Sequence, residues 1–202
     1  ILYDKMSVEE VESAIQQVND TEKFKRSVLT SDLTTFLEMG DNNLRNGLPL
    51  PFPIMTKVFK GRVICEGTYE GECVVSRQGL NTLATFQKSA LKNAKQVIGS
   101  DQNNPDVYGK NLTGIALILP QTIGSTTGGL VIQTICQMGI NPSVLLFADE
   151  IDSLAASGVI LAKNWENSPI IAIDKLGKDI LSAIKTGDRI KVTEDGTVTV
   201  VE

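Results

Sequence analysis

The sequence predicts an α/β domain preceded by a helical N-terminal extension. In the C-terminal half, short apolar runs typical of buried strands alternate with longer segments in which apolar residues recur at helical spacing. Such alternation favours parallel strands joined by crossover helices. Short strands bounded by turn residues come before this region, and a hairpin pattern follows it, so β-structure is expected at both of its ends.

The extension is expected to cover residues 1–54 and to end in a proline-rich strap. A capping box over residues 7–10 with apolar residues on one helical face predicts a first helix, and residues 32–39 predict a second. In residues 47–53, alternate prolines exclude a helix and favour an extended polyproline conformation. We therefore place the domain boundary there and assign residues 55–202 to the main domain.

The main domain is expected to open with two strands and an irregular region. Residues 58–64 and 71–75 have the composition of short strands and are separated by a turn. Residues 78–110 are polar, with a loop at residues 101–105 and a helix expected around residues 86–94.

Strands and helices then alternate as far as a closing hairpin. Three buried strands are predicted, over residues 115–119, 143–147 and 169–173. One helix is expected over residues 130–138, and another is expected to begin near residues 149–153. Asp195 and Gly196 are typical hairpin residues. The strands that they would join are residues 186–192 and 197–201.

Composition and charge exclude several classes of protein. The chain is 42% hydrophobic and 21% charged, as soluble globular proteins are. Its net charge of −5 and its scattered basic residues argue against nucleic-acid binding. No apolar run approaches the roughly 20 residues of a membrane span, and no signal peptide is recognisable, so we expect a cytoplasmic location. Because the chain starts at Ile1, its numbering is expected to begin inside a longer product.

The sequence contains no histidine, so histidine-based triads, dyads and metal sites are excluded unless a partner supplies the histidine. Cys65, Cys73 and Cys136 form no CxxC pair and are expected in the core. Their spacing would not hold zinc or an iron–sulfur cluster unaided. This chain alone is therefore expected to bind no metal.

A glycine-flanked hydroxyl cluster between a strand and a helix is the most informative motif. It reads Gly124, Ser125, Thr126, Thr127 and Gly128. Unpaired N–H groups and the helix dipole favour an anion at a helix N-terminus, so these hydroxyls could meet a carboxylate, a phosphate or a developing alkoxide. The interpretation that these residues simply cap the helix stands at about even odds with anion binding, since serine and threonine are common N-cap residues. A phosphate cradle over residues 124–129 is a third interpretation, although no Walker lysine follows the glycines.

Several short motifs follow one another over residues 59–202. They are Gly61-Arg62-Val63, Glu70-Gly71-Glu72, the loop from Asn104-Pro105 to Tyr108-Gly109-Lys110, Leu119-Pro120, Gly124-Ser125-Thr126-Thr127-Gly128, Pro169-Ile170-Ile171 and Thr186-Gly187-Asp188. In this order they resemble the swivel domain, or small subunit, of the aconitase X family, which are hydro-lyases related to aconitase. The resemblance implies a swivelling β/β/α fold that closes over a larger domain.

The resemblance also implies a partner and roles for the hydroxyl cluster. In this family the large domain or subunit carries an iron–sulfur cluster, a Lewis acid for the departing hydroxyl of a small hydroxy acid. Ser125 matches the serine that acts as general base. Thr126 matches the adjacent substrate-binding hydroxyl, and Gly124, Thr127 and Gly128 are assigned to substrate binding with it. Family substrates include mevalonate 5-phosphate and cis-3-hydroxyproline, and the sequence does not choose between them.

The chemistry expected of Ser125 depends on its surroundings. A serine hydroxyl is intrinsically a poor base, and a helix N-terminus supplies part of the stabilisation that its alkoxide needs. Ile123 departs from the family, which often has an arginine there to bind a substrate carboxylate or phosphate. The departure supports an alternative function, a non-catalytic interaction or regulatory module in which residues 125–128 only cap a helix.

Other conspicuous side chains have structural interpretations. Asp149, Glu150 and Asp152 follow a strand and could face a site, but they are expected in the first turn of a helix, where acidic residues are favoured. Arg62 is expected on the solvated surface, and Trp165 is expected to pack.

Overall fold

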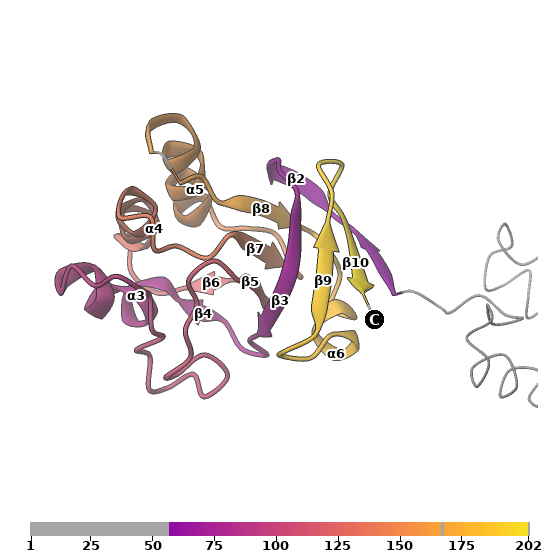
Figure 1. The fold of residues 1–202 in the computed structure, drawn as a ribbon, viewed down its shortest axis with the longest axis horizontal. Coiled ribbons are helices and arrows are strands. Elements are labelled where there is room, and N and C mark those ends of the chain that lie inside the picture. The colour runs from indigo at the N-terminus through magenta and orange to yellow at the C-terminus, as the bar shows by residue number, and fades with distance from the viewer. Residues whose placement is uncertain (1–56, 167, 202) are drawn as a thin grey trace, which may run out of the picture. The chain divides into compact units, whose positions relative to one another are not determined.

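The structure, a computed structural model, describes residues 57–166 and 168–201 (Figure 1). These residues belong to a unit that spans Thr56–Glu202. The helices and the proline strap predicted within residues 1–54 lie outside the described residues, so they stay predictions.

An eight-stranded sheet with the order β1-β10-β9-β3-β5-β7-β8-β2 forms the centre of the domain. Its strands are β1 (Val58–Lys60), β2 (Arg62–Cys65), β3 (Tyr69–Val75), β5 (Ala116–Leu119), β7 (Val144–Phe147), β8 (Ile171–Asp174), β9 (Arg189–Val192) and β10 (Thr197–Val201). Strands β3, β5, β7 and β8 pair in parallel, which confirms the pairing predicted from the alternation of strands and helices. The remaining pairs of this sheet are antiparallel.

Strand β3 belongs to two layers because it pairs with different neighbours along its length. Tyr69 lies opposite Val192 of antiparallel β9, whereas Cys73 lies beside Ala116 of parallel β5. Strands β1, β9 and β10 therefore form a second layer against one face of the parallel strands. The core between the two layers includes Val75, Ile118, Leu146, Ile173, Ile190 and Val198.

Gly61 separates β1 from β2, so the prediction of one strand over residues 58–64 was wrong. A side-chain carbon on Gly61 would lie 2.5 Å from the Asp174 carbonyl oxygen, because the chain passes close to β8 there. The Gly61 N–H donates to the Gly196 carbonyl oxygen at 3.1 Å. The break places β1 and β2 at opposite ends of the strand order, and the sheet folds back on itself.

Three helices cover the other face of the parallel strands, as Figure 1 shows: α3 (Thr82–Leu91), α4 (Gly128–Gln137) and α5 (Ser153–Trp165). The short helix α6 (Ile180–Ala183) lies on the side of β9 and β10. A second core joins the three helices to the sheet. It includes Phe86, Leu117, Ile132, Phe147 and Val159. Two sheet layers and one helix layer confirm the predicted β/β/α fold.

Some local predictions differ from the structure. Helix α3 begins at Thr82 rather than near residue 86, because the Asn81 side chain accepts the Ala84 N–H and caps the helix. Helix α6 was not predicted, since its four residues contain too little helical period. Trp165 is 71% exposed, so the prediction that it packs was wrong. The three cysteines are buried, as predicted.

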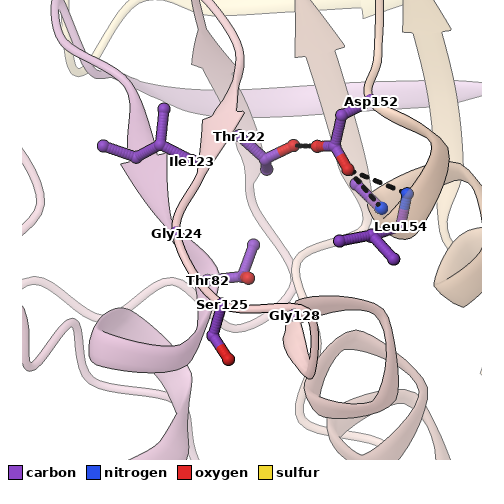
Figure 2. Close-up of a pocket in the computed structure, with 9 residues that line it drawn as sticks. Thr82, Thr122, Ile123, Gly124, Ser125, Gly128, Asp152 and Leu154 are labelled. Carbon is purple, nitrogen blue, oxygen red and sulfur yellow. Dashed lines mark hydrogen bonds between the residues drawn. The ribbon is translucent and has the colours of Figure 1, made fainter.

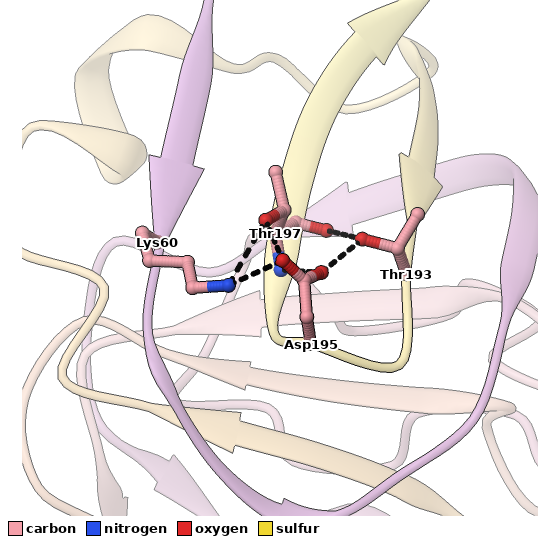
Figure 3. Close-up of polar contacts among 4 residues, drawn as sticks. All are labelled: Lys60, Thr193, Asp195 and Thr197. Carbon is pink, nitrogen blue, oxygen red and sulfur yellow. Dashed lines mark hydrogen bonds and ion pairs between the residues drawn. The ribbon is translucent and has the colours of Figure 1, made fainter.

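Asp195 fixes the closing hairpin to β1 (Figure 3). Its carboxylate accepts hydrogen bonds from the Thr193 hydroxyl and from the Thr197 hydroxyl and N–H, and it pairs with Lys60. The bond from Lys60, with those from the threonines, holds the pKa of Asp195 below its ordinary range. Gly196 follows at φ 84°, a conformation that suits glycine, and the predicted Asp195-Gly196 turn is confirmed.

An ion pair joins β2 to the end of β8. Arg62 donates to both carboxylate oxygens of Asp174, at 2.9 and 2.7 Å, and the Asp174 side chain is fully buried. Asp174 also accepts the Ile151 N–H at 2.9 Å, which fixes the loop before α5. Burial disfavours the charged carboxylate, but the bonds from Arg62 and Ile151 outweigh it, and the pKa of Asp174 lies below its ordinary value. Arg62 is exposed, as predicted, but its guanidinium is also the partner of a buried charge.

Helices α4 and α5 approach each other at two glycines. A side-chain carbon on Gly129 would lie 2.3 Å from the Leu154 carbonyl oxygen, and one on Gly158 would lie 2.3 Å from the Gly129 carbonyl oxygen. Because Gly129 and Leu154 both lie in the first turn of their helices, this contact brings the two helix starts together.

We expect Gly158→Ala to lower the free energy of unfolding by about 1–3 kcal/mol, because the new methyl group would force α4 and α5 apart. Chemical denaturation measures the change. Ser157→Ala is the matched control, since this neighbouring side chain is exposed and bonds only within its own helix. Equal stability of the two variants would show that the helices separate without cost.

We expect Asp174→Asn to destabilise the domain by about 1–3 kcal/mol at neutral pH, because the charge-assisted bonds from Arg62 are weakened. The folded-state pKa lies below the unfolded value of about 3.9, so the ionised carboxylate stabilises the domain fully above that pH and loses this effect as the pH falls through the folded pKa. The difference between wild type and variant should therefore shrink below about pH 4. Denaturation between pH 3 and 7 tests this, and a difference independent of pH would contradict it.

Candidate active site

A cavity of about 210 Å³ lies at the carboxyl end of the parallel strands (Figure 2). It is lined by Thr82, Thr122, Ile123, Gly124, Ser125, Gly128, Asp152, Leu154 and Ala155. The first turns of α3, α4 and α5 all contribute to this lining. Ligands of open α/β sheets bind at this end of the strands, so the position suits a functional site.

Gly124 turns the chain from a short strand into the loop before α4. The strand is β6 (Thr122–Ile123), which pairs in parallel with β4 (Leu80–Asn81). Gly124 has φ 105°, and a side-chain carbon there would lie 2.8 Å from the side-chain nitrogen Nδ2 of Asn81. Conformation and space together therefore require glycine at this position.

Ser125 follows this turn and is half-buried. Its Oγ lies 2.8 Å from Thr127 Oγ1 and accepts the Thr127 N–H at 3.2 Å. The Ser125 carbonyl oxygen accepts the Gly128 N–H at 2.9 Å. Local hydrogen bonds thus orient the hydroxyl at the start of α4.

The start of α4 differs from the starts of the two neighbouring helices. Asn81 caps α3 and Asp152 caps α5 with their side chains, whereas Thr127, the N-cap of α4, makes no such bond. The Gly129 and Leu130 N–H groups have no hydrogen-bond partner among the described residues. The start of α4 therefore carries free donors and the positive end of the helix dipole beside Ser125.

Asp152 joins two elements of the cavity wall. One carboxylate oxygen accepts the Leu154 and Ala155 N–H groups at 2.8 and 3.0 Å, and the other accepts the Thr122 hydroxyl, as Figure 2 shows. Helix α5 begins at Ser153, so Asp152 is its N-cap, and the prediction that the acidic group occupies its first turn was wrong.

The two other acids of that group precede the helix because the loop extends further than predicted. Glu150 pairs with Arg62 at 2.9 Å and with Lys175 at 3.4 Å. Asp149 donates its N–H to the Pro120 carbonyl oxygen at 3.1 Å. Both residues therefore contact segments at the ends of strands and are not part of the helix.

The Ile123 side chain lies on the opposite side of β6 from that of Thr122, as Figure 2 shows. It is 48% exposed and lies over Gly79, where a side-chain carbon would come within 2.7 Å of Ile123 Cγ2. This part of the site is therefore apolar.

The structure brings three of the five predicted site residues to the cavity, namely Gly124, Ser125 and Gly128. Thr126 and Thr127 are exposed and do not line it. The sequence analysis missed other members of the lining, Thr82, Thr122, Leu154 and Ala155. Thr122 lies in a two-residue strand and Thr82 directly follows another, and no periodic pattern marks strands this short. The pairing of Thr122 with Asp152 depends on the fold.

The described residues do not fit a metal centre. In residues 57–166 and 168–201, no three potential ligands among Cys, Asp and Glu gather in one place. Burial raises the pKa of the Cys73 thiol to about 12 and that of Cys136 to about 12, which disfavours the thiolate that binds iron. An iron–sulfur cluster would need ligands from outside this part of the chain. Among the same residues, no helix has the length and apolarity to cross a membrane.

Comparisons with known proteins give consistent results. The family model of the aconitase X swivel domain matches residues 58–200. The phosphomevalonate dehydratase small subunit of Pyrococcus furiosus is 32% identical, over 70% of this chain and 94% of that protein. The protein of the same name from Methanocella arvoryzae is 31% identical, over 71% of this chain and 96% of that protein.

Solved structures are similar as well. Aconitase X from Thermococcus kodakaraensis, in its holo-form, superposes with a TM-score of 0.61 at 28% identity, over 72% of this chain and 99% of that one. The solution structure of a UPF0107 protein gives a TM-score of 0.58 at 25% identity, over 72% of this chain and 100% of that one. This chain therefore belongs to the aconitase X family, and residues 58–200 are its swivel domain.

Proposed function

We propose that this chain is the swivel domain or small subunit of a hydro-lyase that dehydrates a small hydroxy acid, with Ser125 as its general base. The observation that carries the proposal is the position of the Ser125 hydroxyl, which lies beside a cavity at a helix start without a side-chain cap. The curated relatives are named phosphomevalonate dehydratase small subunit, so a phosphorylated hydroxy acid is the proposed substrate and a large subunit the proposed partner.

In this mechanism Ser125 removes the proton next to the substrate carboxylate. The alkoxide that accepts the proton needs stabilisation, which the Thr127 N–H and hydroxyl and the positive end of the α4 dipole supply. The free N–H groups of Gly129 and Leu130 are donors for the charge that develops on the carboxylate as the proton leaves. Gly124 and Gly128 leave space for the substrate beside this loop, and Thr126 and Thr127 bind its polar groups at the exposed edge.

The iron–sulfur cluster that the family implies belongs to the large partner in this proposal, because the described residues do not fit it. The residues of this chain then act on the proton and on the carboxylate, and the partner provides the rest of the site. Ser125 is half-buried, so part of its side chain remains accessible to a second surface.

A second candidate function is a non-catalytic interaction module, which the apolar Ile123 and the local bond between Ser125 and Thr127 favour. In such a module, Ser125 orders the loop and reacts with nothing. The two functions differ in what loss of the hydroxyl does to activity.

We expect Ser125→Ala to reduce kcat of the enzyme assembled with its large subunit by about 10²–10⁴-fold, the usual contribution of a general base. Stability and subunit association should change little, because losing a hydroxyl at a helix start costs only about 0.5–2 kcal/mol. Phosphomevalonate dehydration, thermal unfolding and subunit affinity are measured together.

Ser182→Ala is the matched control, since this exposed serine lies on α6 and bonds only to the Asp179 carbonyl oxygen. Wild-type turnover in the Ser125 variant would place the base elsewhere. Parallel loss of activity and stability would make Ser125 a structural residue and favour the interaction module.

We expect the isolated chain, purified without oxygen and treated with iron and sulfide, to retain no stoichiometric cluster. Its three cysteines are buried in different parts of the domain, on β2, β3 and α4. Iron and sulfide analysis with absorption spectroscopy tests this. A stable cluster bound without the partner would contradict the assignment of the cluster to the large subunit.

A further inference from the structure

The bond between Thr122 and Asp152 connects the segment before Ser125 to the start of α5 (Figure 2). Thr122 is three residues before Ser125, is 8% exposed, and directs its hydroxyl at the carboxylate of Asp152. The bond therefore joins two segments of the cavity wall, namely β6, which precedes α4, and the residue that precedes α5.

Asp152 is held rigidly on the other side of this bond. Its second carboxylate oxygen accepts the Leu154 and Ala155 N–H groups and caps α5. The preceding residue, Ile151, is buried and donates its N–H to Asp174. Helix and loop thus hold the carboxylate independently of its bond with Thr122.

Strand β6, by contrast, has few other attachments. It is two residues long and pairs with the two-residue strand β4. Before it, the Gln121 carbonyl oxygen accepts the Leu80 N–H at 2.9 Å and the Pro120 carbonyl oxygen accepts the Asp149 N–H at 3.1 Å, while Pro120 has no N–H to donate. The hydrogen bond from the Thr122 hydroxyl to Asp152 is the side-chain contact that connects β6 to the start of α5.

We propose that Thr122 and Asp152 are positioning residues, which hold the Ser125 hydroxyl at its working position relative to the start of α4 without touching the reacting atoms. This inference rests on the proposed role of Ser125 as base. A displacement of a reacting group by about 1 Å can cost about 10²-fold in rate, so a bond that fixes β6 acts on kcat rather than on substrate binding.

The test uses the enzyme assembled with its large subunit and phosphomevalonate as substrate. Thr122→Val keeps the shape of the side chain and removes the hydroxyl, and we expect kcat to fall about 10- to 100-fold while KM changes less than about threefold. Thr122→Ser restores the hydroxyl and should keep kcat within about threefold of wild type. Asp152→Ser, which can still cap α5 but cannot also reach Thr122, should show the same fall in kcat.

Thr113→Val is the control, because Thr113 Oγ1 accepts the Val97 N–H in a loop that does not line the cavity. It should lower stability, because it too removes a hydrogen bond, and keep wild-type kcat. If Thr122→Val keeps wild-type kcat while Ser125→Ala is inactive, the positioning role is wrong and the proposed function stands. If Ser125→Ala is fully active, both fall together. If Thr122→Val does not fold, Asp152→Ser decides, and wild-type kcat there overturns the inference.

Discussion

The contact between α4 and α5 at Gly129 and Gly158 determines where the parts of the candidate site lie. A side-chain carbon on either glycine would lie less than 3 Å from a backbone oxygen of the other helix, so the backbones of the two helices are in direct contact. A glycine within a helix costs about 1 kcal/mol relative to alanine, which the close packing offsets. The contact sets the start of α4, and hence Ser125, against the start of α5, and hence Asp152. The other features of the cavity follow from this placement.

The three helices that begin around the cavity differ in whether a side chain caps their first turn. Side-chain caps, which stabilise a helix by about 0.5–2 kcal/mol, are present on α3 and α5 and missing from α4. The domain therefore leaves unpaired donors at the one helix that follows Ser125. Departures from local optimisation of this kind are expected where a site must receive a ligand. The pattern agrees with an anion at the start of α4, as the proposed proton removal next to a carboxylate requires.

Much of the fold follows from local pattern. The apolar runs, the helical spacing of residues 130–138 and the Asp195-Gly196 turn predicted the parallel strands, helix α4 and the closing hairpin, because each depends on residues close in sequence. The break at Gly61 could not be predicted, since it results from the passage of β8 close to that glycine. The early start of α3 depends on one cap, Asn81, within a segment that otherwise has the composition of a loop.

The candidate site was predicted in part for the same reason. The glycines and hydroxyls of residues 124–128 are contiguous, so their composition alone marks a helix start. The rest of the lining comes from distant segments, and Thr122 meets Asp152 because the parallel pairing of β5 with β7 brings the segments after these strands together. Arg62 and Asp174 are even more distant in sequence, 112 residues apart against 30 for Thr122 and Asp152, and their ion pair depends on the pairing of β2 with β8.

The most direct test of the central claim is a structure of the chain assembled with its large subunit and bound substrate. The measured quantity is the distance from Ser125 Oγ to the carbon that loses its proton. The account predicts about 3–3.5 Å, with the substrate carboxylate at the free N–H groups of α4. A substrate held with a different base at that carbon, and with Ser125 beyond contact, would contradict it.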